Sequence, residues 1–184
     1  EAYEVNNDVK IYYGWDKRKI TDELIAFDLE TSGTNPNEDR IIEIGAVKIK
    51  DLEIVDRFDT FVNPHTEITE FISNLTGITN EMVADAPEEK NALADFLKFC
   101  GDNPVLIAHN ARFDTGFITA ALKRNNMELD FSYLDTVPMC QKMLPNLPKH
   151  KLNFVAEHFG FEFNHHRGYD DAEVLGKIFI ELVN

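Results

Sequence analysis

One apolar segment, residues 24–30, carries two acids inside what its composition predicts to be a buried strand. The segment reads Leu-Ile-Ala-Phe-Asp-Leu-Glu, so the acids are Asp28 and Glu30. Because strand side chains alternate between the two faces of a sheet, residues two apart share a face. Charged groups are rarely placed on such a segment unless they are paired or bind a metal, and two oxygen donors suit Mg²⁺ or Mn²⁺. The alternative is an exposed edge strand with two solvated acids.

A third acid, Asp114, follows a second apolar run. Residues 105–108 predict another buried strand, and a helix is expected to begin soon after it, with Asn110 as its N-cap. Asp114 lies at helical spacing from four apolar residues, Phe117, Ile118, Ala121 and Leu122. It therefore shares the core-facing side of the helix, where an unpaired acid is costly.

The last predicted helix offers a fourth acid in two registers, because His165 precedes Asp170 by the same spacing as His166 precedes Asp171. Asp171 shares a helix face with four apolar residues, Val174, Leu175, Ile178 and Leu182. Asp170 shares one with three charged residues, Glu173, Lys177 and Glu181. Asp171 is thus the inward acid, and Asp170 is a helix-start charge favoured by the dipole. A lone histidine is more often a surface imidazole, but the spacing to Asp171 favours a functional His166.

Three segments resemble the exonuclease motifs of the DEDDh (DnaQ-like) 3′–5′ exonucleases. They are residues 27–33 (Phe-Asp-Leu-Glu-Thr-Ser-Gly), 109–114 (His-Asn-Ala-Arg-Phe-Asp) and 166–172 (His-Arg-Gly-Tyr-Asp-Asp-Ala). Residues 41–47 and 75–79 are also similar, and the resemblance runs from about residue 22 to the C-terminus. It is closest to the proofreading domains inside PolC-type replicative polymerases, as the Lys10–Tyr13 lead-in and the doubled histidine before Arg167 indicate. Gly168 departs from the more usual alanine, which a helix start tolerates.

The resemblance implies an α/β, ribonuclease H-like fold with a mixed central sheet, an antiparallel meander plus parallel strands, flanked by helices. It also implies two divalent metal ions, Mg²⁺ or Mn²⁺, one activating the attacking water and one stabilising the leaving oxygen. Asp28 would bridge both ions, Glu30 and Asp171 would complete the nucleophile-side site, and Asp114 would hold the second ion through waters. His166 would be the general base.

Weaker expectations concern the substrate. Five residues are expected to contact the terminal nucleotide, namely Thr31, Ser32, Gly33, His109 and Asn110. A plain helix cap is nearly as good an interpretation of Asn110. Glu43, between Ile42 and Ile44, is expected to orient the metal ligands without binding a metal itself. Asp135 is expected to end a strand and cap a helix, a structural role.

Periodicity and turn residues predict the order of the elements. Strands are expected at about 24–30, 41–50 and 53–62, with a hairpin between the last two, and at 104–108 and 131–135. Helices are expected at about 68–75, 79–84, 87–99, 111–126, 137–144, 151–159 and 171–183. Residues 1–22 are polar with weak alternation and are predicted to be a lead-in, either a linker or an added edge strand. Residues 23–184 are predicted to form the exonuclease domain.

Composition sets outer bounds on these expectations. A chain of 184 residues with 43% hydrophobic content predicts one domain with a substantial core, and no apolar run is long enough to span a bilayer. Cys100 and Cys140 are too few for a disulfide framework, which suits a reducing cytoplasm. The chain begins with Glu1, as expected either of a piece cut from a longer polypeptide or of a processed chain.

The net charge of −15 argues against tight intrinsic binding of nucleic acid, since phosphate contacts normally need a basic surface. Bound metal ions would supply positive charge at the scissile phosphate. A DNA polymerase catalytic domain, in the same or a partner chain, would hold this domain close to the DNA. The resulting high effective concentration would make up for weak intrinsic affinity.

The sequence therefore predicts release of nucleoside 5′-monophosphates from single-stranded or frayed 3′ ends of DNA, for proofreading during replication. One alternative is an RNA-trimming 3′–5′ exoribonuclease of the same fold, because nothing in the motifs reads the sugar. The other is a non-catalytic nucleic-acid-binding module, against which the intact acids argue.

Overall fold

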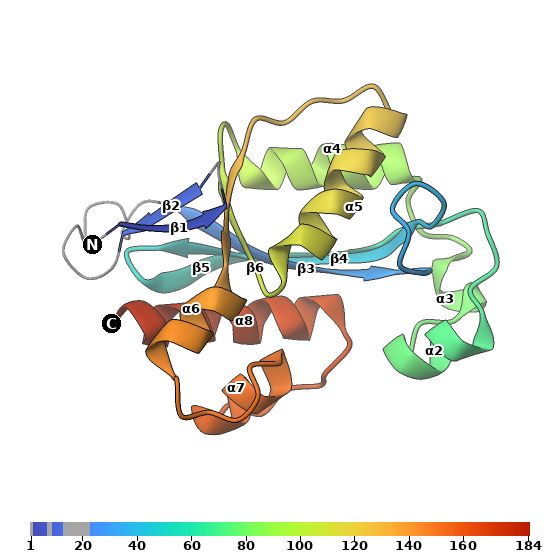
Figure 1. Cartoon of the computed structure of the whole chain (residues 1–184). Coiled ribbons are helices and arrows are strands. Elements are labelled where there is room, and N and C mark those ends of the chain that lie inside the picture. Colours follow the sequence, from blue (N-terminus) through green and yellow to red (C-terminus); the bar gives the residue numbers. More distant parts are fainter. Residues whose placement is uncertain (1, 7–8, 13–22) are drawn as a thin grey trace.

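The computed structural model describes residues 2–6, 9–12 and 23–184, and its centre is a five-stranded sheet (Figure 1). The strands lie in the order β5 (Glu53–Phe61), β4 (Ile41–Lys50), β3 (Leu24–Thr31), β6 (Val105–Ala108) and β7 (Ser132–Asp135). β3, β4 and β5 form an antiparallel meander, whereas β6 pairs in parallel with both β3 and β7. The predicted mixed sheet is confirmed.

Helices cover both faces of this sheet (Figure 1). α4 (Glu89–Cys100) and α5 (Ala111–Arg124) pack on one face, and α6 (Thr136–Met143), α7 (Leu152–His158) and α8 (Gly168–Val183) pack on the other. Two short helices, α2 (Glu70–Thr76) and α3 (Asn80–Val83), lie at one end. The predicted α/β class with flanking helices is therefore confirmed.

Strand β3 is buried between these two helix layers and is apolar on both faces. Ile25, Phe27 and Leu29 pack into the cluster that holds α4 and α5. Leu24 and Ala26 pack into the cluster that holds α8. Because side chains alternate, Asp28 and Glu30 continue the Leu24 and Ala26 face and point toward α8. The fold thus places both acids between β3 and the last helix.

Most predicted helix and strand boundaries are close to the observed ones. The difference that matters most for the site is at the start of α8. This helix begins at Gly168 rather than at residue 171, so the fourth acid lies one turn inside it. The predicted hairpin is present, with Lys50 opposite Glu53 and positive φ at both turn residues, 52° at Asp51 and 63° at Leu52. Two such residues match the right-handed twist of the flanking strands.

The N-terminal part that the structure describes is a small hairpin. β1 (Ala2–Asn6) and β2 (Val9–Tyr12) pair with each other in a separate two-stranded sheet, and neither is hydrogen-bonded to the five-stranded sheet. The predicted added edge strand is therefore not seen in this part, and Tyr13 of the lead-in lies outside the described residues. The boundary at residue 22 stays a prediction. No helix in the described ranges is long and apolar enough to cross a bilayer.

Candidate active site

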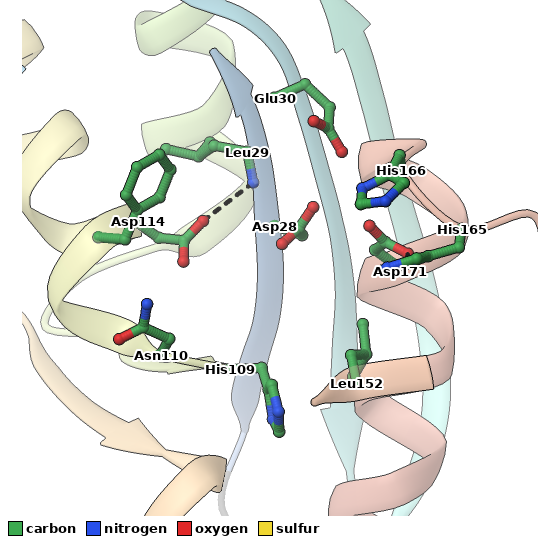
Figure 2. Close-up of a pocket in the computed structure, with 11 residues that line it drawn as sticks. Asp28, Leu29, Glu30, His109, Asn110, Asp114, Leu152, His165, His166 and Asp171 are labelled. Carbon is green, nitrogen blue, oxygen red and sulfur yellow. Dashed lines mark hydrogen bonds and ion pairs between the residues drawn. The ribbon is translucent and has the colours of Figure 1, made fainter. Parts of the chain in front are cut away.

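The site is built where β3 runs past the end of its neighbour β6. β6 pairs only with residues 24–26 of β3, so the following residues have an open edge on that side. There the Leu29 backbone N–H donates a hydrogen bond of 3.1 Å to Oδ1 of Asp114, near the start of α5 (Figure 2). Asp114 thus substitutes for a strand partner, which fixes its carboxylate beside Asp28 from the opposite helix layer.

Helix α8 brings the fourth acid to the same place. Asp171 is 4% exposed, whereas Asp170 is half-buried, so the helix phase predicted from the sequence is confirmed. Oxygen atoms of Asp28, Glu30 and Asp171 lie within 4.8 Å of one another. Figure 2 shows these three facing each other, with Asp114 across β3. The structure therefore brings together all four predicted acids from three separate elements.

These acids line a pocket of about 210 Å³. Its eleven lining residues are Asp28, Leu29, Glu30, His109, Asn110, Phe113, Asp114, Leu152, His165, His166 and Asp171. His109 and Asn110 are among them, as expected of substrate contacts, but Thr31, Ser32 and Gly33 are not. Leu29, Phe113, Leu152 and His165 were not predicted as site residues.

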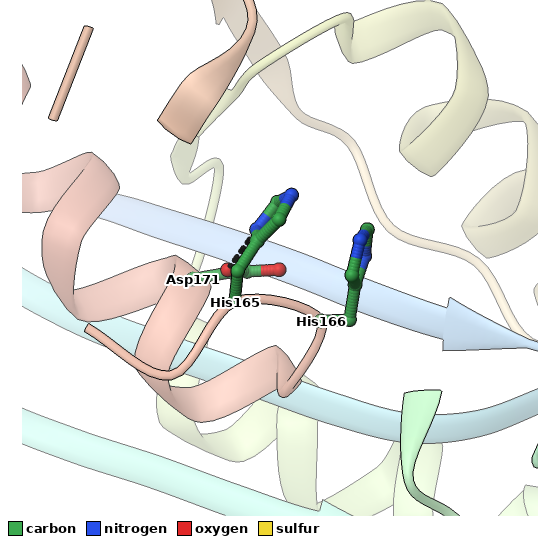
Figure 3. Close-up of side chains that lie close together, drawn as sticks. All are labelled: His165, His166 and Asp171. Atoms are coloured by element: carbon green, nitrogen blue, oxygen red, sulfur yellow. Dashed lines mark hydrogen bonds and ion pairs between the residues drawn. The ribbon is translucent and has the colours of Figure 1, made fainter. Parts of the chain in front are cut away.

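Two histidines stand at the edge of the pocket beside Asp171 (Figure 3). The rings of His165 and His166 stack with centroids 3.7 Å apart, and His166 has a positive φ of 69°. Nδ1 of His165 donates to Oδ1 of Asp171 at 3.1 Å. The structure places the predicted His166 in the pocket lining. Sequence reasoning missed the contact of His165 with Asp171, because helix periodicity says nothing about the loop before α8.

Asp28, Glu30 and Asp114 have raised pKa values because they are buried among other acids. Burial first, and then the neighbouring acids Asp114 and Asp171, raise the pKa of Asp28 well above its usual range. Burial and the Asp171 charge raise the pKa of Glu30 to about 9, and burial raises that of Asp114 to about 8. Among the described residues, no lysine or arginine forms an ion pair with these three acids. Arg167 is the nearby positive charge and only partly offsets the raised pKa of Glu30, and the oxygen donors of these acids fit hard divalent cations.

This electrostatic arrangement predicts a pH dependence of stability for the metal-free protein. Glu30 has a higher pKa when folded than when unfolded, so the folded state binds more protons and loses stability as pH rises from about 4 toward 9. Glu30→Gln removes this term. In EDTA, the variant should gain free energy of unfolding over the wild type as pH rises from 5.5 to 8.5, by up to about 1.4 kcal/mol per pH unit. Urea unfolding at both pH values measures it, and an equal difference at both would contradict it.

The pKa of His166 shifts the other way. Burial and the neighbouring His165 ring lower it from its usual value. His166 is therefore neutral near pH 7, the form in which an imidazole can accept a proton.

The start of α5 differs from the prediction, and the difference frees a side chain. Asn110 occupies the N-cap position in the left-handed conformation (φ 68°) and makes no side-chain capping bond. The carboxylate of Asp135 caps α5 instead, accepting from the backbone N–H groups of Asn110 and Ala111 at 3.0 Å each, and it also accepts from Val137 at the start of α6. Asp135 is the predicted structural cap, but for two helices, and the Asn110 side chain is left to face the pocket.

His109 is held more firmly than a free substrate ligand would be. Its Nε2–H donates to the carbonyl oxygen of His150 at 2.6 Å, and its Nδ1 lies 2.8 Å from the hydroxyl of Thr136. Burial lowers the pKa of His109. Both ring nitrogens therefore have protein partners, and the ring joins β6 to the segment before α7.

Three predicted substrate residues instead shape the loop after β3. The Thr31 hydroxyl donates to the Gly33 carbonyl at 2.6 Å, and the Ser32 hydroxyl accepts from the Arg40 backbone N–H at 2.9 Å. A Cβ on Gly33 would lie 2.3 Å from Asp39 Oδ2, so a larger residue there would have to displace the Asp39 side chain. Their contact with a nucleotide stays a prediction.

The chain is similar to part of a bacterial DNA polymerase. The chain is 45% identical over 179 residues to the DNA polymerase III PolC-type of Clostridium perfringens, a match covering 97% of this chain and 12% of the relative. It is 41% identical over 184 residues to the protein of the same name from Caldanaerobacter subterraneus, covering 100% and 13%. The chain thus spans only 12–13% of the length of these relatives.

Solved structures share the fold. Exonuclease I of E. coli, in complex with a 5cy-dA13 oligonucleotide, superposes with a TM-score of 0.75 at 19% identity, over 88% of this chain and 40% of that one. Exonuclease X, in complex with 5′ overhanging duplex DNA, gives 0.66 at 23% identity, over 87% and 89%. A 3′-exonuclease that recognises a histone mRNA stem-loop gives 0.74 at 20%, over 89% and 64%. The predicted ribonuclease H-like fold is confirmed.

A family model described as an exonuclease matches residues 25–179, which include every acid of the pocket and both stacked histidines. The resemblance drawn from the three motifs is confirmed, and members of the DnaQ-like family generally depend on divalent metal ions. The chain belongs to this exonuclease family.

Proposed function

We propose that this chain is a 3′–5′ exodeoxyribonuclease domain that releases nucleoside 5′-monophosphates from DNA 3′ ends and proofreads during replication. The observation that carries the proposal is the convergence of Asp28, Glu30, Asp114 and Asp171 on one pocket beside His166. These residue types came from three separate motifs in the sequence, and three different elements deliver them to one place.

The proposed cofactors are two divalent metal ions, Mg²⁺ or Mn²⁺. Asp28, Glu30 and Asp171 would hold one, since their oxygens already lie within 4.8 Å of one another, and Asp28 with Asp114 would hold the other. When bound, the ions would supply the positive charge that lowers the pKa of a water and stabilises charge on a phosphate. The buried carboxylates would lose their excess protons as they become ligands.

His166 is proposed as the general base. Its ring lines the pocket beside Asp171, and its lowered pKa keeps it neutral and able to take a proton from an attacking water. Asn110, whose side chain faces the same pocket and makes no capping bond, is proposed to hydrogen-bond the terminal nucleotide. Contacts of this nucleotide with Thr31, Ser32, Gly33 and His109 are also proposed, and of these four only His109 lines the pocket.

The proposed substrate is a single-stranded or frayed 3′ end, and the proposed partner is a polymerase catalytic domain in the same or a second chain. The name of the curated relatives supports the polymerase partner, although the chain matches only a small part of each. Solved structures of this fold in complex with an oligonucleotide and with 5′ overhanging duplex DNA support the substrate. The charge of −15 supports tethering, because a strongly acidic domain gains little from phosphate attraction. We propose a cytoplasmic location, which the proposed replicative role and two buried free cysteines support.

Digestion of 5′-labelled single-stranded DNA and a matched RNA, with Mg²⁺, Mn²⁺ or EDTA, tests the proposal. We expect a ladder that shortens from the 3′ end of the DNA, mononucleotide 5′-phosphates as products, and no cleavage in EDTA. Faster digestion of the RNA would favour the exoribonuclease alternative. Binding without cleavage under all metal conditions would favour a non-catalytic module.

A further inference from the structure

Glu43 is the most deeply buried acid that the proposed chemistry does not use. It lies in β4 directly opposite Glu30 of β3 and is 0% exposed. A carboxylate removed from water needs hydrogen-bonding partners, and besides Asp59 of β5 those of Glu43 come from the start of α8. It accepts from the backbone N–H of Gly168 at 3.1 Å, from Nε of Arg167 at 3.4 Å and from Nη2 of Arg167 at 3.3 Å.

These partners form the N-terminus of α8, which has no side-chain cap of its own. Arg167 occupies the N-cap position, and no side-chain capping bond is present there. The first N–H groups of a helix have no partner inside the helix, and a negative charge near them is favourable. Glu43 therefore caps α8 from another element of the fold.

The backbone at the start of α8 packs tightly against the backbone of β3 and β4. A Cβ on Gly45, which pairs with Asp28 across the sheet, would lie 2.1 Å from the carbonyl carbon of Gly168. A Cβ on Gly168 would lie 3.3 Å from the Asp28 carbonyl oxygen. The first residue of α8 thus rests directly on the strands that carry the acids, so a shift of the helix start would also shift Asp171.

Arg167 also holds the start of α8 against the sheet, and it directly follows His166 in the chain. Its guanidinium carbon lies 5.3 Å from the ring centroid of Phe61, so the side chain is held between Glu43 and an aromatic face of β5. Burial and the neighbouring Glu43 also raise the pKa of Asp59, on the same strand, to about 7. The residue that precedes Arg167 is His166.

We propose that Glu43 and Arg167 are a positioning pair, which fixes His166 and Asp171 by attaching the start of α8 to β4. The pair touches neither substrate nor metal in this proposal. It acts through its neighbours in the chain, one residue back to His166 and four residues on to Asp171. The inference rests on the proposed nuclease function, because it assigns the pair to that site.

Glu43→Gln tests the pair with little change of shape, since the amide oxygen still accepts from Gly168 while the charge that holds Arg167 is lost. We expect kcat on single-stranded DNA to fall about 10- to 100-fold, with KM within about twofold. In a double-mutant cycle, we expect the variant that carries both Glu43→Gln and Arg167→Gln to lose no more kcat than the more impaired of the two single variants. Far-UV circular dichroism checks the fold. If Glu43→Gln does not fold, Arg167→Gln alone removes the same pair from its half-exposed side.

Arg57→Gln is the matched control. Arg57 also joins a strand to α8, through an ion pair of 2.8 Å with Glu173, but it lies outside the pocket. We expect its kinetics to match the wild type within about twofold. Unchanged kcat in folded Glu43→Gln would overturn the proposal. A rise in KM alone on Arg167→Gln would also overturn it, since that is the signature of direct substrate contact.

A measurement without activity separates this inference from the proposed function. In ¹H–¹³C spectra of the metal-free protein, with His166 assigned from His166→Asn, the His166 ring signals should move in Glu43→Gln and stay unchanged in Arg57→Gln. Moved signals in a chain that cleaves nothing would keep the pair and reject the nuclease. Unmoved signals would reject the pair and leave the nuclease standing.

Discussion

Asp28→Ala is expected to lower exonuclease turnover by at least about a thousandfold, equivalent to about 4 kcal/mol, in saturating Mg²⁺. Asp28 is the electrostatic centre of the site, because Asp114, Asp171, Glu30 and Glu43 all raise its pKa. Its removal therefore takes away the carboxylate on which both proposed metal positions depend. Single-turnover digestion of labelled DNA measures the effect.

The same substitution should leave the metal-free protein folded and at least as stable as the wild type, because it relieves repulsion among buried acids. Thermal unfolding in EDTA tests this. Asp170→Ala is the matched control, since Asp170 is an acid of α8 outside the pocket lining. Near-normal turnover of Asp28→Ala in Mg²⁺ would show that the two-metal interpretation is wrong.

Changing His166 or Asp171 is expected to have the next largest effect. Loss of a general base costs about 10²–10⁴-fold in rate, and loss of a buried metal ligand should cost at least as much. His166→Ala and Asp171→Ala should therefore both fall into this range. Rates at saturating metal and substrate are the appropriate measurement, because they report the chemical step rather than binding.

His165→Ala and Asp170→Ala should be mild by comparison, at less than about tenfold. His165 makes one hydrogen bond to Asp171, which Asp171 would exchange for a metal ion. Asp170 lies outside the pocket. Equal losses at His165 and His166 would mean that the metal-bound site uses both rings, and that helix phase alone chose between them without warrant.

Helix and strand periodicity predicted which way the side chains of the four acids point. Asp28 and Glu30 were placed on one face because strand residues two apart always share it. Asp114 and Asp171 were placed inward because each lies on the apolar side of a helix, and both are buried. These four positions follow from local patterns, which the tertiary structure only had to bring together.

Features that depend on contacts between distant elements could not be predicted in the same way. The capping of α5 by Asp135 joins residues 25 positions apart, and the bond from Gly168 to Glu43 joins residues 125 apart. Asn110 has the residue type of an N-cap, yet the carboxylate of Asp135 caps the helix instead. The stacking of His165 on His166 depends on loop conformation, for which the sequence offers no period. Sequence patterns therefore identified the acids, but not the bonds that hold their supports in place.

The order in which the ligands occur along the chain bears on biosynthesis. Asp28 and Glu30 are translated before Asp114, and Asp171 lies on α8, the last helix that the structure describes. A growing chain therefore carries three of the four proposed ligands before α8 supplies the fourth. Because α8 also covers the face of β3 on which the first two acids lie, ligand completion and burial of that face coincide. The proposed metal site is therefore expected to form only when α8 docks on β3.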